Sequence, residues 1–458
     1  MSSLRQELRT VSRLSAPVVL SQLGLMLMGV VDTLMLSRVG VTELAASALG
    51  NAWQWTWMSL GMGLVMGIDP LISQAHGRGD GPGTALALQR GVLIAVAASL
   101  PICTAMLLTE RGLTLLGQEP AVAALAGRYN LYKFPTAPLF LVYSALRQYL
   151  QGRTLMAAAT SVIWLANLVH AGINWLLIFG HGGLPALGIE GAGIASSLST
   201  AFLVVGLALW VRAFKLHAGA WRPWDRDSFD GRGLLRAARL GLPVGLQLSF
   251  EACAFSVSTL MAGWLGREAL ASHQIVLNLA ALSFMVPLGV SQGAATRVGN
   301  LIGAGDSEGM RRAVTASLLM GAGVMTVSAT LFTLLRFELP RLYSDDPRVV
   351  LLAAEIFPFA AAFQLSDGTQ VVAGGVLRGM GRPDAAAVLN LLGYYVVALP
   401  LAYVVAFGYG RGLPGIWLSL AVGLAVVAGS LLVWVLRTAR RPIARLWISE
   451  DAAPSALP

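Results

Sequence analysis

Residues 63–80 read GLVMGIDPLISQAHGRGD and residues 289–306 read GVSQGAATRVGNLIGAGD, so the glycines and the closing aspartate recur 226 positions later. The repeat extends outward over more than sixty residues without a gap. The first copy contributes Pro17, Val18, Leu20, Gly40, Leu44, Ala45, Gly63, Gly67, Gly77, Gly79 and Asp80, which match Pro243, Val244, Leu246, Gly266, Leu270, Ala271, Gly289, Gly293, Gly303, Gly305 and Asp306. A duplicated hydrophobic unit of this size is typical of secondary transporters.

The composition predicts an all-α polytopic membrane protein. Of the 458 residues, 56% are hydrophobic and 12% are charged, whereas a soluble domain carries about 25% charged residues. A bilayer core about 30 Å thick needs about 20 apolar residues per helix. We expect twelve transmembrane helices, at about residues 14–37, 44–74, 85–108, 121–146, 157–179, 188–211, 237–263, 268–301, 312–335, 349–376, 385–407 and 413–436.

The basic residues predict the topology. With a cytoplasmic N-terminus, 23 of the 32 Lys and Arg residues fall in cytoplasmic loops or tails, which is the positive-inside pattern. This places both termini in the cytoplasm and the chain in a bacterial inner or plasma membrane, with no cleavable signal peptide. The net charge of +9 is thereby explained by topology, and no nucleic-acid partner is expected.

The longest polar stretch divides the chain into two six-helix lobes. Residues 212–236 (RAFKLHAGAWRPWDRDSFDGRGLLR) form an expected cytoplasmic linker, which could include a short amphipathic helix. Six spans in each half make the repeat parallel, because both halves enter the membrane from the same side. The expected divisions are a cytoplasmic N-terminus at 1–13, lobes at 14–211 and 237–436 around the linker, and a cytoplasmic tail at 437–458.

Three carboxylates lie well inside predicted spans: Asp32, Glu251 and Asp367. Each ionised carboxylate at mid-bilayer depth costs about 2.5–3.5 kcal/mol, and a transporter can recover this cost by binding a cation or a proton. The alternative is a structural ion pair. Few basic residues are available for it, since Arg90, Lys133 and Arg147 are expected near span ends, where long side chains reach the interface.

Other polar and aromatic residues are candidates for the same sites. Asn167, His170 and Asn174 share one face of the fifth span and could complete a site with Asp32, although ordinary interhelical hydrogen bonding explains each equally well. Four further residues are candidate substrate-cavity residues: Gln247, Gln364, Trp53 and Trp57. Interface anchoring is the commoner role for such tryptophans.

Three segments together resemble the MATE family of multidrug and toxic compound extruders, and more specifically its NorM-like branch. They are VVDTLMLSRVG at 30–40, QLSFEA at 247–252 and SDGTQVVAGGVLRGMGRP at 366–383. The resemblance covers about residues 10–440, and LRGMGRP is its most specific string.

The resemblance implies secondary active efflux of organic, often cationic compounds in exchange for Na⁺ or H⁺. It assigns Glu251 and Asp367 as cation or proton ligands of the second lobe and Asp32 as the acid of the first. Relatives often carry two asparagines where this chain has His170 and Asn174, and the titratable imidazole favours protons.

Three other classes of protein are alternatives. A lipid-linked precursor flippase would need cationic side chains to hold pyrophosphate, and a channel would conduct without coupling. An enzyme would need a nucleophile–base pair or a metal cluster, and none stands out. We therefore expect no enzymatic activity, no cofactor besides the coupling ion, no metal site, and a monomer whose partners are small molecules and the lipid bilayer.

Overall fold

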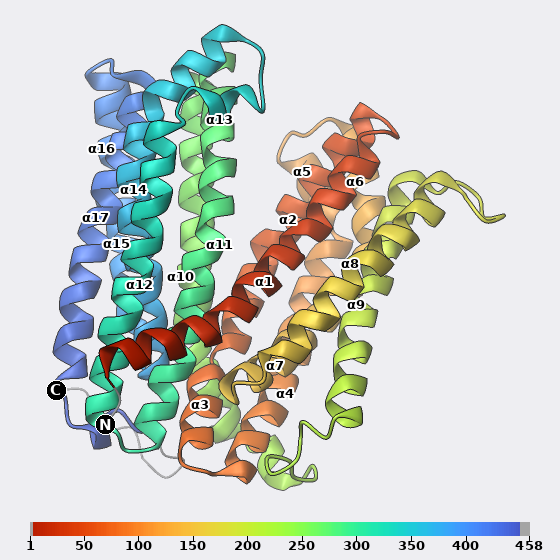
Figure 1. Ribbon diagram of the computed structural model, residues 1–458. Coiled ribbons are helices and arrows are strands. Elements are labelled where there is room, and N and C mark those ends of the chain that lie inside the picture. The colour runs from red at the N-terminus through yellow and green to blue at the C-terminus, as the bar shows by residue number, and fades with distance from the viewer. Residues whose placement is uncertain (1–2, 449–458) are drawn as a thin grey trace. The chain divides into compact units, whose positions relative to one another are not determined.

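The computed structural model describes residues 3–448 and, within them, contains helices and no strands (Figure 1). The expected segments 1–13 and 437–458 therefore lie partly outside the described residues. The helices are α1 (Leu4–Leu36), α2 (Val41–Met66), α3 (Asp69–Gly77), α4 (Gly81–Leu107), α5 (Thr109–Leu115), α6 (Pro120–Lys133), α7 (Thr136–Gly152), α8 (Met156–Phe179), α9 (Gly188–Ala213), η1 (Arg226–Phe229), α10 (Gly231–Trp264), α11 (Arg267–Gly303), α12 (Ser307–Leu334), α13 (Glu338–Arg341), α14 (Pro347–Gly379), α15 (Asp384–Leu392), η2 (Gly393–Ala398), α16 (Leu399–Tyr403), η3 (Val404–Gly408), α17 (Gly412–Ala439) and η4 (Ile443–Arg445).

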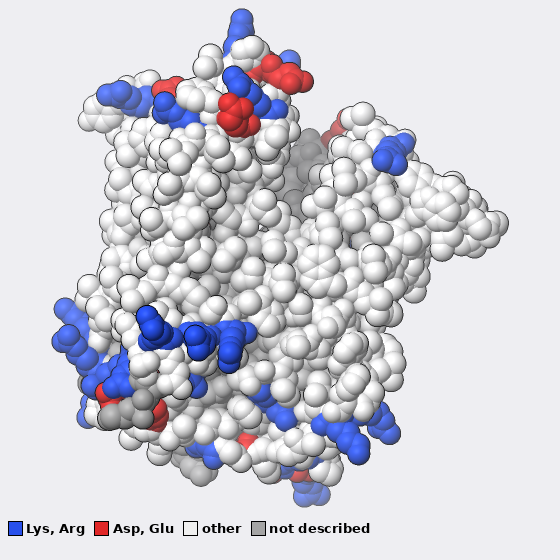
Figure 2. Space-filling view, viewed as in Figure 1, with Lys and Arg blue, Asp and Glu red and all other residues white. Residues whose placement is uncertain are grey.

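Each of the twelve expected spans corresponds to helix in this structure. Ten segments of the described chain are long and apolar enough to cross a membrane. The other two expected spans are interrupted, one between α2 and α3 and one at Phe134–Pro135 between α6 and α7. Pro135 explains the second break, since proline donates no backbone hydrogen bond, while Phe134 and Pro135 themselves keep helical dihedral angles. Figure 2 shows charged side chains gathered toward the ends of the helices, with an uncharged band between them.

The chain forms two compact units whose boundaries fall inside helices. One unit, here the N-unit, comprises Leu20–Gly245, and the other, the C-unit, comprises residues up to Val19 together with those from Leu246 onward. The first part of α1 therefore belongs to the C-unit, and the first part of α10 belongs to the N-unit. In each repeat, the first long helix therefore begins in one unit and continues in the other.

The repeated glycines explain this exchange. In the N-unit, a side chain at Gly63 of α2 would overlap the backbone of Gly245 in α10. In the C-unit, a side chain at Gly289 of α11 would overlap Val19 in α1. Both pairs are related by the same offset of 226 residues. Small residues allow helix backbones to approach closely in this way, so the repeat preserves two equivalent helix contacts.

The repeated polar loops are helix caps. Asp80 Oδ1 accepts a hydrogen bond from the Gly83 backbone N–H at 2.8 Å, and Asp306 Oδ1 accepts one from Gly309 at the same distance. The preceding Gly79 has φ +75°, which favours glycine. An aspartate at the N-cap satisfies a backbone donor that the helix leaves unpaired. The aspartate of the sequence HGRGDG therefore caps the start of α4, and this structural role explains the glycine-rich loop.

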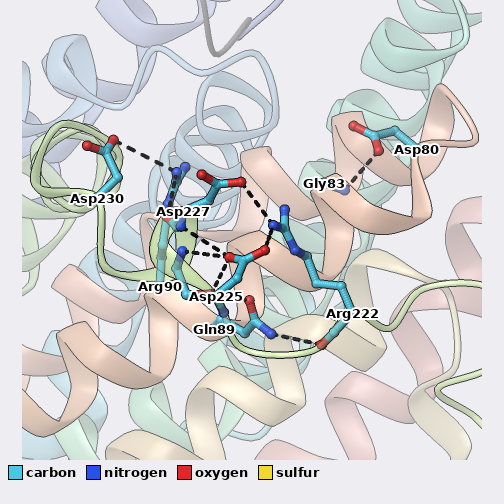
Figure 3. A network of polar contacts seen from close by, with 9 residues as sticks. Asp80, Gly83, Gln89, Arg90, Arg222, Asp225, Asp227 and Asp230 are labelled. Atoms are coloured by element: carbon cyan, nitrogen blue, oxygen red, sulfur yellow. Dashed lines mark hydrogen bonds and ion pairs between the residues drawn. The ribbon is translucent and has the colours of Figure 1, made fainter.

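The linker between the halves is part of the N-unit and is bonded to helix α4 (Figure 3). Gln89 Nε2 of α4 donates to the Arg222 carbonyl at 3.0 Å, and Arg90 donates to the Asp227 carbonyl at 3.1 Å. Arg222 in turn pairs with Asp225 and with Asp227. Its guanidinium holds the pKa of the Asp225 carboxyl below its usual range, so this contact is present at neutral pH and is lost on strong acidification. Between the end of α9 and the start of α10, the linker forms one short 3₁₀ turn, η1.

The Gly63 contact gives the first prediction. Gly63→Ala should lower the melting temperature of the purified protein, because overpacking against a fixed backbone costs about 1–3 kcal/mol. Gly29→Ala is the matched control, since nothing lies within 4 Å of a side chain at that position. Thermal unfolding followed by size-exclusion chromatography compares the two variants. Equal melting temperatures for them would contradict the exchanged-helix packing.

Candidate functional site

The buried acid of the N-unit is Asp32 in α1. Its side chain accepts a hydrogen bond from Asn174 Nδ2 at 2.7 Å and lies 2.8 Å from His170 Nε2. Ser196 of α9 donates to the other carboxylate oxygen at 3.4 Å. Asp32 is 7% exposed, and His170 and Asn174 are more deeply buried. Three helices thus converge on one carboxylate, two of whose partners stand one turn apart on α8.

The imidazole of His170 bridges two helices. Its Nδ1 lies 3.0 Å from Ser199 Oγ of α9, while its Nε2 faces Asp32. A serine hydroxyl can donate or accept, so this arrangement suits both the neutral and the protonated imidazole. Asp32, His170 and Ser199 thus form one continuous row of polar contacts across α1, α8 and α9.

Asn167 does not join this site. Its Nδ2 donates to the Gly24 and Ile163 carbonyls, each at 2.9 Å. These bonds join α8 to α1 by ordinary interhelical packing. The polar face predicted for the fifth span is therefore divided, with two residues at Asp32 and one residue in a structural contact.

Lys133 lies elsewhere than expected. It ends α6 at the break in the middle of the fourth expected span, and its Nζ donates to Asn51 at 2.5 Å and to the Tyr129 hydroxyl at 2.9 Å. Tyr129 is fully buried, donates from its hydroxyl to Asn51 Oδ1 at 3.3 Å, and interacts electrostatically with Asp32. The expectation that Lys133 reaches the interface from a span end is wrong. The helix ends at this residue, and its ammonium group is directed toward the polar side chains of Asn51 and Tyr129.

Arg90 and Arg147 also differ from that expectation. They are 8% and 4% exposed, so neither extends into the interface as a free side chain. Arg90 contacts the linker, including Asp230 at 4.0 Å. These positions show that basic side chains within the spans are used for contacts inside the N-unit.

The acids of the C-unit, Glu251 in α10 and Asp367 in α14, have a different environment. The two carboxylates interact electrostatically with each other. Asp367 is 6% exposed and its Oδ1 has no hydrogen-bond partner among residues 3–448, whereas Glu251 is partly exposed. None of the ion pairs in that described part of the chain involves either acid. Two like charges thus share an apolar region without a basic partner.

The four expected cavity residues are distributed between the units. In the C-unit, Gln364 is fully buried and donates to Ser283 Oγ at 2.9 Å, while Gln247 is partly buried. In the N-unit, Trp53 donates to the Ala105 carbonyl at 2.8 Å and meets Trp57 edge-on at 6.0 Å. Trp57 is 42% exposed. Trp53 is therefore fixed by packing, and Trp57 is the freer of the two rings.

Two residues beside the acids were missed by the sequence reasoning. Tyr129 interacts electrostatically with Asp32, and Tyr394 interacts electrostatically with both Glu251 and Asp367. Tyr394 lies in the π-helical segment η2, within an apolar run that gives no polar periodicity. Such π segments often occur at functional sites. The spacing of four between Tyr129 and Lys133 was a signal available in the sequence.

Comparison with known proteins identifies the family. The model of the family described as MatE matches residues 17–176 and 243–404, which is well over half of the chain. The chain belongs to the MatE family. The matched segments include all three acids, Asp32, Glu251 and Asp367.

Individual members of the MatE family are similar over nearly the whole chain. "Probable multidrug resistance protein NorM" of Mesorhizobium japonicum is 35% identical, with 95% of each chain covered. "Multidrug resistance protein PmpM" of Pseudomonas aeruginosa is 34% identical, over 96% of this chain and 93% of that protein. The crystal structure of the eukaryotic MATE transporter AtDTX14 superposes with a TM-score of 0.88 at 22% identity, covering 97% of this chain and 100% of that one. This last likeness supports the fold.

The Asp32 cluster gives the second prediction. Asp32→Leu and Asn174→Leu should each lower the melting temperature. The double variant should lose little more stability than either single variant, because both changes remove the same buried bond between Asn174 and Asp32. A hydrogen bond to a charged group contributes about 1.5–3 kcal/mol. The control pair is Asp32→Leu with Asn167→Leu, whose costs should add, since Asn167 bonds to Gly24 and Ile163. If the losses of stability in Asp32→Leu and Asn174→Leu add up in the double variant, the shared bond at this site would be contradicted.

Proposed function

We propose that this protein is a secondary active multidrug efflux transporter that exports organic, often cationic compounds in exchange for Na⁺ or H⁺. The observation that carries the proposal is the pair of acids in the C-unit, Glu251 and Asp367, which have no basic partner among the described residues. The names of the relatives in M. japonicum and P. aeruginosa, both multidrug resistance proteins, support the substrate class.

The charge of the two acids supplies the coupling. Two carboxylates close together in an apolar region repel each other unless a cation or proton neutralises them. Ion binding therefore favours the conformation that shields Glu251 and Asp367, and substrate binding favours the other. Coupling follows when each ligand binds the two conformations with different affinity.

The N-unit contributes a second titratable site. Asp32 already has a partner in His170, whose Nε2 lies 2.8 Å from the carboxylate. We propose that this pair takes part in proton-linked steps of the cycle. Gln247, Trp53 and Trp57 are our candidates for contacts with the exported compound.

The proposal includes the arrangement in the membrane. The transporting parts are two parallel six-helix lobes, residues 14–211 and 237–436, joined by a cytoplasmic linker at 212–236. The loop distribution of Lys and Arg supports cytoplasmic termini and a bacterial inner or plasma membrane. We propose that the protein works as a monomer, since each lobe carries its own acid.

The third prediction tests the function directly. Purified protein in proteoliposomes should drive dye efflux under a Na⁺ gradient alone or a pH gradient alone. Glu251→Gln and Asp367→Asn should each lower the driven rate by more than about ten-fold, the factor that corresponds to 1.4 kcal/mol. Glu355→Gln is the matched control, because this glutamate lies on α14 with Asp367 but is exposed.

Two outcomes would contradict the proposal. Driven efflux by both site variants at the wild-type rate would show that neither acid couples ion and substrate movement. Flipping of a labelled pyrophosphate lipid without gradient-driven dye efflux would instead favour the flippase.

A further inference from the structure

The beginning of α1, in the part that belongs to the C-unit, carries a row of arginines. Arg5, Arg9 and Arg13 are four residues apart, so they lie on one face of the helix at intervals of about 6 Å. All three are exposed. Figure 2 shows basic side chains in a row over the region where Figure 1 places the start of α1. We call Arg5, Arg9 and Arg13 the arginine row.

The opposite face of this segment is fixed to α11. Glu7 and Val11 on that face are 0% exposed. The Glu7 carboxylate accepts hydrogen bonds from Arg297 Nε at 2.8 Å and from Arg297 Nη2 at 2.7 Å, which makes a bidentate ion pair. A side chain at Gly293 of α11 would overlap Ser15, so the two helices are also in close contact further along. The segment therefore cannot rotate freely about its axis, and the arginine row keeps its outward orientation.

The arginine row has no anionic partner within residues 3–448. None of the ion pairs in that part of the chain involves Arg5, Arg9 or Arg13. Glu7 is the one acid in residues 4–19, and it is paired with Arg297 on the other face. Like charges four residues apart destabilise a helix. Three in succession therefore favour an anion from outside the described chain.

The position of the row along α1 indicates which anions are near. The same helix continues into a segment that is long and apolar enough to cross a membrane, and the first expected span begins at residue 14. Arg13 thus adjoins the hydrocarbon core, and Arg9 and Arg5 lie about 6 and about 12 Å further along the helix. Lipid headgroups form a layer about 5–8 Å thick beside the core, and long arginine side chains reach into it. The nearest anions are therefore the phosphates of membrane lipids.

The general excess of basic residues on one side of the membrane does not explain this arrangement. That excess concerns how many Lys and Arg residues the loops contain, and it does not require a regular spacing on one helix face. Guanidinium groups form bidentate hydrogen bonds with phosphate oxygens, and basic residues next to a transmembrane helix are attracted to anionic lipids. Spacing, exposure and position together fit a lipid surface.

We propose that the arginine row binds the phosphate groups of anionic phospholipids in the leaflet at the start of α1. The bound headgroups supply the negative charge that the described chain does not provide to these three side chains. This inference goes beyond the proposed function, because it requires the membrane-spanning fold alone and involves neither the coupling ion nor the exported compound.

Thermal unfolding of the purified protein in a non-ionic detergent tests the arginine row without measuring transport. Phosphatidylglycerol should raise the melting temperature relative to an equal concentration of phosphatidylcholine, because a ligand that binds only the folded state stabilises it. Each arginine near an anionic lipid surface adds about five-fold to the affinity. The triple variant Arg5→Gln, Arg9→Gln, Arg13→Gln should therefore weaken the apparent affinity for phosphatidylglycerol by at least about ten-fold.

The matched control removes the same number of charges elsewhere. Arg38, Arg111 and Arg411 are exposed, and none of them belongs to an ion pair in the described part of the chain. Replacing these three with Gln should leave the affinity for phosphatidylglycerol unchanged. Equal losses in the two triple variants would overturn the inference, since the lipid would then respond to net charge alone.

Two soluble anions distinguish a lipid from other partners. Inorganic phosphate and polyglutamate should raise the melting temperature much less than phosphatidylglycerol does at the same concentration of negative charge. If either one stabilises the protein equally, and the effect is lost in the triple variant of the arginine row, a soluble phosphate or an acidic protein segment would replace the lipid as the partner.

Salt gives a second readout of the same contact. Raising KCl from about 0.1 M to about 1 M shortens the screening distance from about 10 Å to about 3 Å. The affinity of the unmodified protein for phosphatidylglycerol should fall over this range, and that of the triple variant should change much less. An affinity that does not depend on salt in either protein would contradict binding through charge.

A single substitution keeps the test decisive if the triple variant does not fold. Arg9→Gln removes the central charge of the row and should weaken the affinity for phosphatidylglycerol by about five-fold. The single control is Arg111→Gln, which should have no effect. Unchanged affinity in Arg9→Gln would overturn the inference.

Discussion

The main physical constraint on this structure is the free energy needed to keep a carboxylate inside an apolar helical unit. Asp32 meets this cost with protein groups, since His170, Asn174 and Ser196 all contact it. Asp367 does not, because one of its oxygens has no partner within residues 3–448 and its electrostatic neighbour is another acid, Glu251. The two units therefore differ in chemistry: the N-unit surrounds its acid with hydrogen-bonding side chains, and the C-unit leaves a carboxylate oxygen of Asp367 without a partner among residues 3–448. Our proposal that the C-unit acids bind an ion or a proton rests on this difference.

This difference arises on a symmetric scaffold. The repeat preserves the residues that define backbone contacts, namely the glycines at the exchanged helices and the aspartates that cap α4 and α12. It does not preserve the acids: the position that matches Asp32 is Ser258, and the position that matches Glu251 is Leu25. The two requirements are physically separate, since close helix packing depends on small side chains and ion binding depends on a few oxygen atoms. Duplication thus supplied the frame, and each half acquired its own polar site.

The sequence predicted the helical spans and the acids inside them, because apolar runs are local signals. It left open whether His170 and Asn174 join Asp32 or make ordinary interhelical hydrogen bonds, and the structure shows that they join it. It did not predict the exchange of helix ends, since the boundaries after Val19 and Gly245 lie inside continuous helices. The predicted position of Lys133 near a span end was also wrong, because hydropathy does not reveal the helix break at Pro135. Tyr394 was missed because an apolar stretch hides which ring faces an acid. Packing partners that are distant in the sequence decide the first and the third of these features, and the helix break at Pro135 decides the second.

The central claim is that a proton or a cation neutralises Glu251 and Asp367, so that a bound cation takes the place of a proton. Infrared difference spectroscopy of the membrane-reconstituted protein measures this directly, because a protonated carboxyl and a carboxylate absorb at separate positions. On addition of Na⁺ at constant pH, we predict loss of a protonated-carboxyl band and gain of a carboxylate band. Both changes should be absent from the Glu251→Gln, Asp367→Asn double variant. Carboxylate bands for these two acids that are already present without Na⁺ and unchanged by it, at every pH tested, would contradict the account.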